Sequence, residues 1–284
     1  MQEKERQCDN GGSRGNVNNV SEAGNSETAS FGKITVIGTG PGDTDHLSKK
    51  ALEAIKDSQT VIGYSSYLKQ IDGILSEMQE RLSFNMKDEI KRCEAAVKKS
   101  MEGMDVALVS GGDAGIYGMS GLLLEIIEKK SLLGKIPVDF IPGIPAFCAA
   151  SCAVGAPIMN DFCVISLSNL LTPWEDIEKR LRAASQGDFV IILYNPKSMK
   201  RKNELTIAKD ILLESLDKDR PVAIVKAVTR PDEEIVITTL KNMDNFDIVG
   251  MNTSIIIGSS NTYVKDFFMI TKRGYGNKYN LDLA

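Results

Sequence analysis

The chain lacks the features of a membrane, metal or redox protein. No apolar run approaches the roughly 18 residues of a membrane-spanning helix, so we expect no membrane association. Its 284 residues include a single histidine, His46, and five cysteines that form no C-x-x-C pair. Two ligands of the same kind rarely come close in such a sequence, so it predicts no metal site. Free thiols are typical of a reducing cytoplasm, where we expect the protein to reside.

The common nucleotide-binding motifs are also missing. No G-x-x-x-x-G-K-[ST] sequence occurs, which disfavours an ATP-type phosphate cradle. The segment GTGPGD (38–43) fits the dinucleotide motif G-x-G-x-x-G only in part, because Asp43 replaces the last glycine. A nicotinamide or flavin oxidoreductase is therefore disfavoured. A net charge of −4 argues against general affinity for nucleic acid, which depends on neutralising phosphates.

What is present is a regular alternation of apolar strands and amphipathic helices after an N-terminal segment, 1–31, that we expect to be a disordered tail. Such alternation is typical of α/β folds with mostly parallel sheets. The segment IPGIPA (141–146) reads as a hinge, so we predict two α/β domains, 32–141 and 142–284, with a cleft between them. The predicted strands are 33–38, 60–64, 105–112, 138–143, 162–167, 188–195, 221–228, 233–240 and 253–259; the predicted helices are 47–58, 89–99, 119–129, 174–185 and 203–213.

Two glycine-rich turns follow predicted strands in the first domain, GTGPGD (38–43) and GGDAGIYG (111–118). Each contains an aspartate, and the carboxyl ends of parallel strands are where ligands bind in α/β sheets. Glycines allow the backbone to approach a ligand closely. A carboxylate such as Asp113 repels phosphate but suits a cation or a hydroxyl group, unless it only caps the next helix. S-adenosylmethionine, with its sulfonium, ammonium and ribose diol, meets that description.

Five segments carry a resemblance to a known family: GTGPGD, GGDAGIYG, IPGIPAFCAASCAVGAP, LYNPKSMKRKNEL and VKAVTRPDEE. In this order they resemble the tetrapyrrole (corrin/porphyrin) methyltransferases, over residues 33 to about 270. Within the family they are most similar to enzymes that methylate C17 of precorrin-3B, or its cobalt form, and contract the ring in cobalamin biosynthesis. The resemblance implies two α/β domains, S-adenosylmethionine in the cleft between them, and a homodimer.

The resemblance also implies site residues. S-adenosylmethionine would contact Pro41, Gly111, Gly112, Asp113, Ile116, Pro145, Ala146, Asn195, Ala227 and Thr253. Two of these depart from the family, since many relatives have Ser or Thr in place of Pro145 and methionine in place of Asn195. A basic group would hold the carboxylates of the tetrapyrrole: Lys197, Lys200, Arg201 and Arg230. Such a run of charge is equally typical of a solvated helix face.

Several questions stay open at this point. Asp43 is the nearest candidate for a general base, although it equally suits the capping of a helix. Whether the substrate carries cobalt is open as well. The alternative functions are methylation of another precorrin carbon, such as C11, of ribosomal RNA or of a modified histidine in a translation factor, and binding of the cofactor without catalysis.

Overall fold

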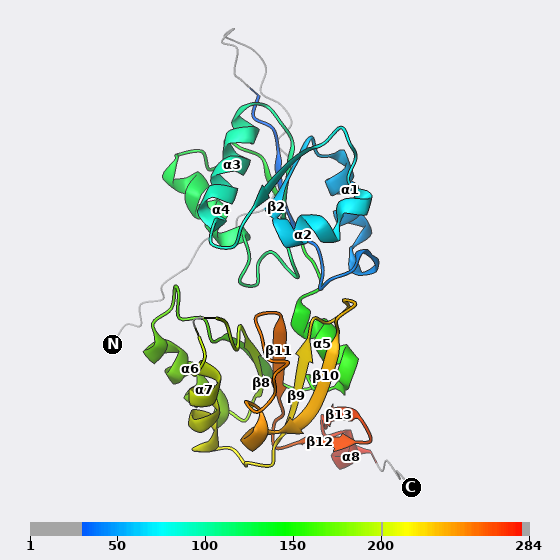
Figure 1. Cartoon of the computed structure of the whole chain (residues 1–284), viewed down its shortest axis with the longest axis vertical. Coiled ribbons are helices and arrows are strands. Elements are labelled where there is room, and N and C mark those ends of the chain that lie inside the picture. Colours follow the sequence, from blue (N-terminus) through cyan, green and yellow to red (C-terminus); the bar gives the residue numbers. More distant parts are fainter. Residues whose placement is uncertain (1–29, 200, 280–284) are drawn as a thin grey trace, which may run out of the picture.

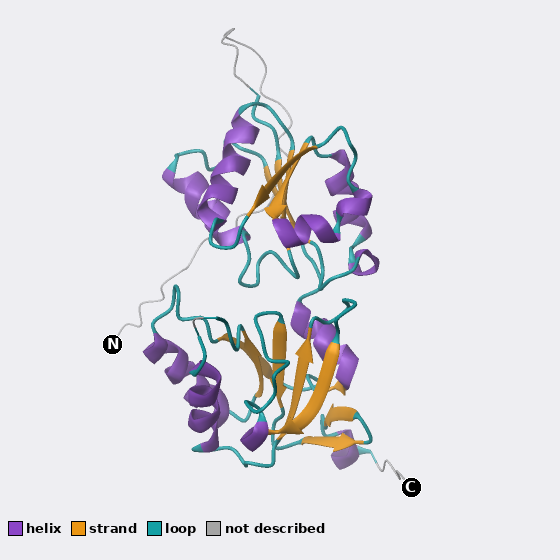
Figure 2. Cartoon of the chain, viewed as in Figure 1, coloured by secondary structure: helices purple, strands orange, loops and turns teal. Residues whose placement is uncertain are grey.

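The computed structural model describes residues 30–199 and 201–279, which form an N-terminal and a C-terminal half stacked along the long axis of the molecule (Figure 1). Each half is built on a five-stranded sheet with helices on both faces (Figure 2). The predicted α/β fold is therefore confirmed. The predicted tail lies outside the described residues, apart from Ser30 and Phe31.

The sheet of the N-terminal half is entirely parallel, with strand order β3-β2-β4-β1-β5. Its central strands are continuous apolar runs and are buried from end to end, as parallel strands covered on both faces are. In chain order the elements are β1 (Ile34–Gly38), a 3-10 turn (Thr44–His46), α1 (Lys49–Asp57), β2 (Thr60–Tyr64), α2 (Ser65–Gln70), a 3-10 turn (Asp72–Ile74), β3 (Glu80–Phe84), α3 (Glu89–Met101), β4 (Val106–Ser110), α4 (Ser120–Lys129) and β5 (Val138–Ile141).

Alternate side chains of these strands enter two separate hydrophobic cores. Val36 and Leu108 point toward α3 and α4, while Ile37 and Val109 point toward α1 and α2. This alternation follows from the two-residue period of a strand. Because the five strands are parallel, their carboxyl ends all lie at the same edge of the sheet, and both glycine turns emerge there.

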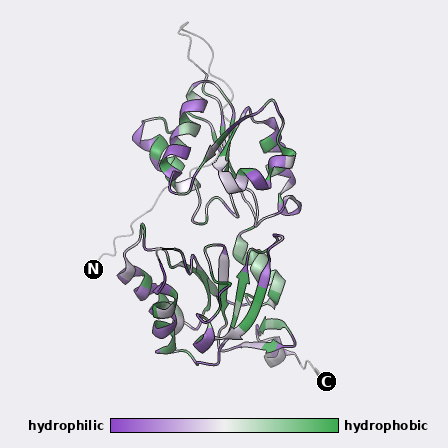
Figure 3. Ribbon diagram, viewed as in Figure 1, coloured by the Kyte–Doolittle hydropathy of each residue, from purple (hydrophilic) through white to green (hydrophobic). Residues whose placement is uncertain are grey.

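The C-terminal half contains a sheet with strand order β10-β9-β11-β8-β7 and a three-stranded sheet with order β12-β13-β6. Helix α5 covers one face of the larger sheet and α6 and α7 cover the other. Figure 3 shows hydrophobic residues along its strands and hydrophilic ones on α6 and α7. The elements are α5 (Ala146–Val154), β6 (Gly155–Ala156), β7 (Phe162–Ser166), α6 (Trp174–Gln186), β8 (Val190–Tyr194), α7 (Glu204–Leu213), β9 (Pro221–Lys226), β10 (Glu234–Thr239), a 3-10 turn (Leu240–Asn242), β11 (Thr253–Ile257), β12 (Thr262–Lys265), β13 (Phe268–Thr271) and α8 (Tyr275–Lys278).

The expectation of mostly parallel sheets is wrong for this second sheet. Only β7 and β8 pair in parallel, whereas the pairs β8–β11, β11–β9 and β9–β10 are antiparallel. For β9 and β10 the reason is local, because the loop between them contains no helix and a parallel crossover needs a connection of about a dozen residues or more. The direction of β11 is set where it pairs between β8 and β9. As a result β7, β8 and β9 run one way and β10 and β11 run the other.

No helix within residues 30–199 and 201–279 is long and apolar enough to cross a membrane.

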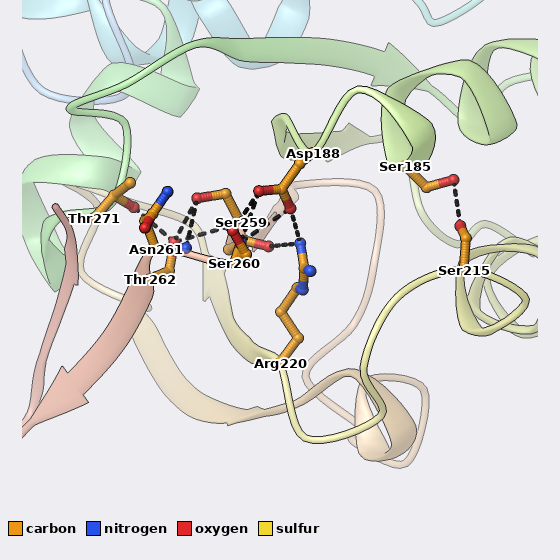
Figure 4. Close-up of polar contacts among 10 residues, drawn as sticks. Ser185, Asp188, Ser215, Arg220, Ser259, Ser260, Asn261, Thr262 and Thr271 are labelled. Carbon is orange, nitrogen blue, oxygen red and sulfur yellow. Dashed lines mark hydrogen bonds and ion pairs between the residues drawn. The ribbon is translucent and has the colours of Figure 1, made fainter. Parts of the chain in front are cut away.

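A polar network fastens the end of the larger C-terminal sheet that lies away from the N-terminal half (Figure 4). Arg220 donates to Asp188 at 2.5 Å, and the backbone and hydroxyl of Ser260 donate to the same carboxylate at 3.0 and 2.5 Å. Three loops, before β8, before β9 and after β11, thereby meet at one carboxylate. Burial opposes ionisation of Asp188, but the bonds from Ser260 and Arg220 outweigh it and lower the pKa of its carboxyl group.

We expect Asp188→Asn to lower the free energy of unfolding by about 1 kcal/mol at neutral pH, because a partly exposed charge-assisted pair contributes about that much. A lowered folded-state pKa stabilises the fold above the unfolded value and loses effect as the pH falls through the folded value. The difference from wild type should therefore shrink below about pH 3.8. Urea unfolding across that range checks this. Asp210→Asn, at an exposed position of α7, is the control. A difference that persists unchanged at low pH would contradict the prediction.

Candidate active site

A cavity of about 380 Å³ lies between the two halves. The N-terminal wall is made by the carboxyl ends of β1, β2 and β4, which meet at one edge because the strands are parallel. The C-terminal wall is made by the carboxyl ends of β8 and β9 and the amino end of β11. The lining residues are Pro41, Tyr64, Ser66, Tyr67, Met86, Ser110, Gly111, Gly112, Asp113, Ile116, Tyr117, Pro145, Ala146, Tyr194, Asn195, Ala227, Val228, Arg230, Met251, Asn252, Thr253 and Ser254.

The structure brings together all ten residues predicted for the cofactor. They lie on both walls, up to 212 positions apart between Pro41 and Thr253, and every one of them lines this cavity. Arg230 lines it too, whereas Asp43, Lys197 and Arg201 do not. Lys200 lies outside the described residues. That these residues bind a cofactor or substrate stays a prediction.

The glycine turn that lines the cavity is part of a close contact among four glycine backbones. Gly40 and Gly112 exchange two hydrogen bonds, at 3.1 and 2.7 Å, which tie the two glycine turns together. Gly143 of the hinge packs directly against Gly112 and Gly38. A Cβ atom on Gly143 would lie 2.1 Å from the Gly112 carbonyl oxygen, and one on Gly38 would lie 2.5 Å from the Gly143 nitrogen. The hinge is therefore seated where only glycine fits.

Asp113 fastens the same junction with its side chain. One carboxylate oxygen accepts from the N–H of Gly115 at 2.8 Å, and the other accepts from the N–H of Gly143 at 3.0 Å. The carboxylate thus bridges the second glycine turn and the hinge. It does not cap α4, the alternative role that the sequence suggested, because that helix begins later, at Ser120.

The backbone around the cavity is held in unusual conformations. Tyr117, Asn195 and Ala227 have positive φ angles of 53°, 53° and 48°. Such conformations are uncommon for residues other than glycine, and they cluster at functional sites where the surrounding fold enforces them. The enforcing contacts include the amide of Asn195, which donates to Ser166 at 3.0 Å, and the N–H of Ala227, which donates to the Asn252 carbonyl at 2.9 Å.

Two side chains join the halves across the cavity. The guanidinium group of Arg230 donates through Nε and Nη2 to the carbonyl of Pro41, both at 3.2 Å. On the other side, the hydroxyl of Tyr117 donates to the carbonyl of Val164 at 3.1 Å. Each half therefore supplies one side chain that donates to a backbone carbonyl of the other half, and neither contact is an ion pair.

Asp43 has a local role. Its carboxylate accepts from the backbone N–H of His46 at 3.1 Å and lies 2.5 Å from the ring nitrogen Nδ1. Burial opposes its ionisation, but these contacts with His46 outweigh it and lower the pKa of Asp43. A carboxylate with a lowered pKa is a weaker proton acceptor. The geometry favours the capping role for Asp43, and its role as a base stays a prediction.

The basic residues after β8 are placed differently from one another. Arg201 is 7% exposed; Nη1 donates to the hydroxyl of Ser168 at 3.2 Å, and Nε has no partner among the described residues. Lys197 is half-buried. A chain of hydrogen bonds from Arg201 through Ser168 and Ser166 reaches Asn195, at the wall of the cavity.

Sequence reasoning missed the aromatic part of the N-terminal wall. Tyr64 and Tyr67 pack edge to face with ring centroids 5.3 Å apart, and Met86 follows β3 nearby in the lining. The signal was present, because Tyr64 ends a buried strand next to β4.

The cavity is suited to a ligand that carries both polar and apolar parts. Asp113 is its one acidic and Arg230 its one basic lining residue within residues 30–199 and 201–279. The other lining groups are hydroxyls, amides, exposed backbone and apolar side chains. Within the same range no group of three or more His, Cys, Asp and Glu side chains could hold a metal ion. The cavity is therefore suited to binding and orienting a small molecule.

Comparison with known proteins identifies the family. The family model of tetrapyrrole (corrin/porphyrin) methylases matches residues 33–244. The chain belongs to this family. The match includes both glycine turns, the hinge and the carboxyl ends of β8 and β9, so it contains most of the cavity wall described above.

Three relatives illustrate the similarity. The cobalt-factor III methyltransferase of Priestia megaterium is 46% identical over 253 residues; the alignment covers 88% of this chain but only 46% of that protein. A probable cobalt-factor III C(17)-methyltransferase of Salmonella typhimurium is 46% identical over 85% of this chain and 99% of its own length. The precorrin-3B C(17)-methyltransferase of a Sinorhizobium species is 37% identical over 82% of this chain and 91% of its own.

Solved structures share the fold. The methyltransferase CobJ superposes with a TM-score of 0.81 at 32% identity, over 85% of this chain and all of that one. A uroporphyrin-III C-methyltransferase from Thermus thermophilus, complexed with S-adenyl homocysteine, has a TM-score of 0.65 at 19% identity, over 80% of this chain and 97% of that one. The second likeness shows the fold alone.

The glycine junction makes a sharp prediction about stability. Gly143→Ala should lower the free energy of unfolding by about 1–3 kcal/mol, since its methyl group would overlap the Gly112 carbonyl and the main chain must move. Gly121→Ala, in α4 with nothing near the added methyl group, should be neutral or stabilising. Denaturant unfolding of both variants checks this. Equal stability of the two variants would show that the hinge tolerates displacement.

Proposed function

We propose that this chain is an S-adenosylmethionine-dependent methyltransferase that methylates C17 of a precorrin-3-type tetrapyrrole and contracts its ring, in cobalamin biosynthesis. One observation supports the binding of S-adenosylmethionine: all ten positions predicted for it, from both halves, line one cavity. The identity of the substrate rests on the relatives named for C17 methylation, one of which aligns along 99% of its length. The cobalt-factor III relatives are 46% identical and the precorrin-3B relative 37%, which favours the cobalt-containing substrate.

The cavity fits S-adenosylmethionine by size and by chemistry. Its volume of about 380 Å³ is within the usual range for small-molecule sites. The left-handed backbone at Gly112, with φ +64°, opens space beside the turn without a side chain. Backbone carbonyls and hydroxyl groups provide acceptors for the ammonium and ribose groups. When bound, the cofactor supplies an activated methyl group that needs no acid from the protein.

The residues of the chain then have positioning roles. The glycine junction fixes the N-terminal wall relative to the hinge, and Asn195 and Ala227 fix the C-terminal wall. Two reacting groups held at about 3 Å and in line react far faster than free ones, so this rigidity is the main contribution of the protein. Ile116, Val228 and Met251 line the cavity with apolar surface and exclude water from it.

We further propose that Lys197, Lys200, Arg201 and Arg230 bind carboxylates of the tetrapyrrole. Arg201 supports this most directly. It is a buried cation without an acidic partner among the described residues, and such a charge is costly unless an anion pairs with it. Arg230 lines the cavity itself. Methylation at C11 or of RNA is the alternative outcome.

Product analysis tests the proposed function. Purified protein, cobalt-factor III and labelled S-adenosylmethionine should give a product with one added methyl group, and carbon labelling should place it at C17 of a contracted ring. Metal-free precorrin-3B, assayed in parallel, should be the poorer substrate. Methylation at C11, or of ribosomal RNA with the tetrapyrrole unchanged, would refute the substrate assignment and leave the fold and the family unaffected.

We expect Gly112→Val to weaken S-adenosylmethionine binding by tenfold or more while the protein stays folded. The added Cβ meets only ordinary contacts, 3.7 Å or longer, so the side chain fills the space beside the turn. Its positive φ costs about 1–2 kcal/mol of strain. Gly134→Val is the matched control, because Gly134 has a similar φ of +78° and open surroundings. Calorimetry measures affinity and circular dichroism the fold; unchanged affinity in folded Gly112→Val would move the cofactor elsewhere.

Three wider features belong to the same proposal. Residues 32–141 and 142–284 would be the two domains, and each contains its own five-stranded sheet. A homodimer is proposed from the family, and exposed aromatic side chains on or directly beside β12, β13 and α8 suit an interface: Tyr263, Phe267, Phe268, Tyr275 and Tyr279. A cytoplasmic location is proposed because Cys93, Cys148, Cys152 and Cys163 are all free thiols.

A further inference from the structure

Arg92 is a buried cation that is neither a predicted site residue nor part of the cavity lining. It lies in the first turns of α3 and is 4% exposed. Its Nε is buried without a hydrogen-bond partner among the described residues, and within the same residues its side chain makes only a loose ion pair. That pair joins Nη2 to Glu89 at 3.6 Å, and Glu89 is 43% exposed. A buried guanidinium group with so little compensation is unfavourable in the free protein.

Tyr67 lines the cavity, and the charge of Arg92 reaches its hydroxyl. Its ring lies over Gly111, where an added Cβ would be 2.5 Å from Cε1, and it lines the cavity wall. Its hydroxyl has no hydrogen-bond partner among the described residues. Burial raises the pKa of Tyr67, and the positive charges of Arg230 and Arg92 oppose that rise. Both guanidinium groups therefore act on the same hydroxyl, which stays protonated at neutral pH and is able to donate.

Arg230 completes the group from the C-terminal half. Nε and Nη2 hold the Pro41 carbonyl, which leaves Nη1 without a partner among the described residues. The carboxylate of Asp113, the acidic lining residue, is occupied by the N–H groups of Gly115 and Gly143. This part of the wall thus offers donors and positive charge, and the carboxylate that also acts on Tyr67, that of Glu89, is partly exposed and only loosely paired with Arg92.

We propose that Tyr67 and Arg230, with Arg92 behind them, form a subsite that binds a carboxylate of the ligand. The proposal rests on the proposed function, which supplies two sources of this group: the acidic side chains of the tetrapyrrole and the amino-acid end of S-adenosylmethionine. Tyr67 and Arg230 would contact the carboxylate. Arg92 is a positioning residue, whose charge favours an anion at the Tyr67 hydroxyl.

Three variants and one control test the subsite. Tyr67→Phe removes the hydroxyl and keeps the ring over Gly111. Arg92→Met removes the buried charge, and Arg92→Lys keeps a charge at the same place. Lys91→Met, at the neighbouring and 73% exposed position of α3, is the control. Each protein is measured for its melting temperature without ligand, its Kd for S-adenosylmethionine by calorimetry, and its Kd for uroporphyrin, a stable polycarboxylate tetrapyrrole, by absorbance.

We expect Tyr67→Phe and Arg92→Met to weaken the binding of one of the two ligands by about tenfold or more, as the loss of a charge-assisted hydrogen bond does. Arg92→Lys should restore part of the affinity, and the melting temperature of Arg92→Met should equal or exceed that of wild type. A weaker Kd for uroporphyrin identifies the tetrapyrrole as the source of the carboxylate. A weaker Kd for S-adenosylmethionine identifies the amino-acid end.

Unchanged affinity for both ligands in either Tyr67→Phe or Arg92→Met would overturn the subsite. So would a lower melting temperature of Arg92→Met with no rescue of affinity by lysine, since that result describes a structural arginine. The melting temperatures and dissociation constants are measured without turnover. Absence of methylation by the wild type would therefore count against the proposed function and not against the subsite.

Discussion

The contact among the backbones of Gly38, Gly112 and Gly143 is the constraint on which the rest of the site depends. A Cβ atom on Gly38 or Gly143 would clash there, and the Asp113 carboxylate fixes the contact by accepting from the Gly143 N–H. The junction joins two turns and the hinge at one point. Where the hinge is seated determines where α5 begins, and therefore how the C-terminal wall faces the N-terminal one.

Most of the regular structure could be predicted from the sequence, for a simple physical reason. Buried strands such as β1, β4 and β11 are continuous apolar runs, and the helices between them have apolar stripes at helical spacing. The elements that escaped prediction lack those signals. Helix α2 has six residues and no side-chain cap, β3 is a partly charged edge strand, and α5 is apolar nearly all round.

Strand direction and the full cavity wall were harder to predict, because both depend on contacts between distant segments. β11 enters the sheet between β8 and β9, and nothing in its own residues specifies that it runs against both. The resemblance to the family indicated ten positions that line one cavity in the structure, including Thr253 at the amino end of that strand. It did not point to Tyr67 or Arg92, whose importance follows from what lies beside them in the fold.

The commitment of Asp113 to the backbone has a consequence for the electrostatic field of the molecule. The chain carries a net charge of −4, so at long range the molecule as a whole repels an anion. Among the described residues that line the cavity, the one carboxylate is shared between two N–H groups, whereas Arg230 has no acidic partner. Walls of low polarity concentrate such a local field. A polyanionic ligand would therefore be attracted to the opening of the cavity although the molecule as a whole is negatively charged.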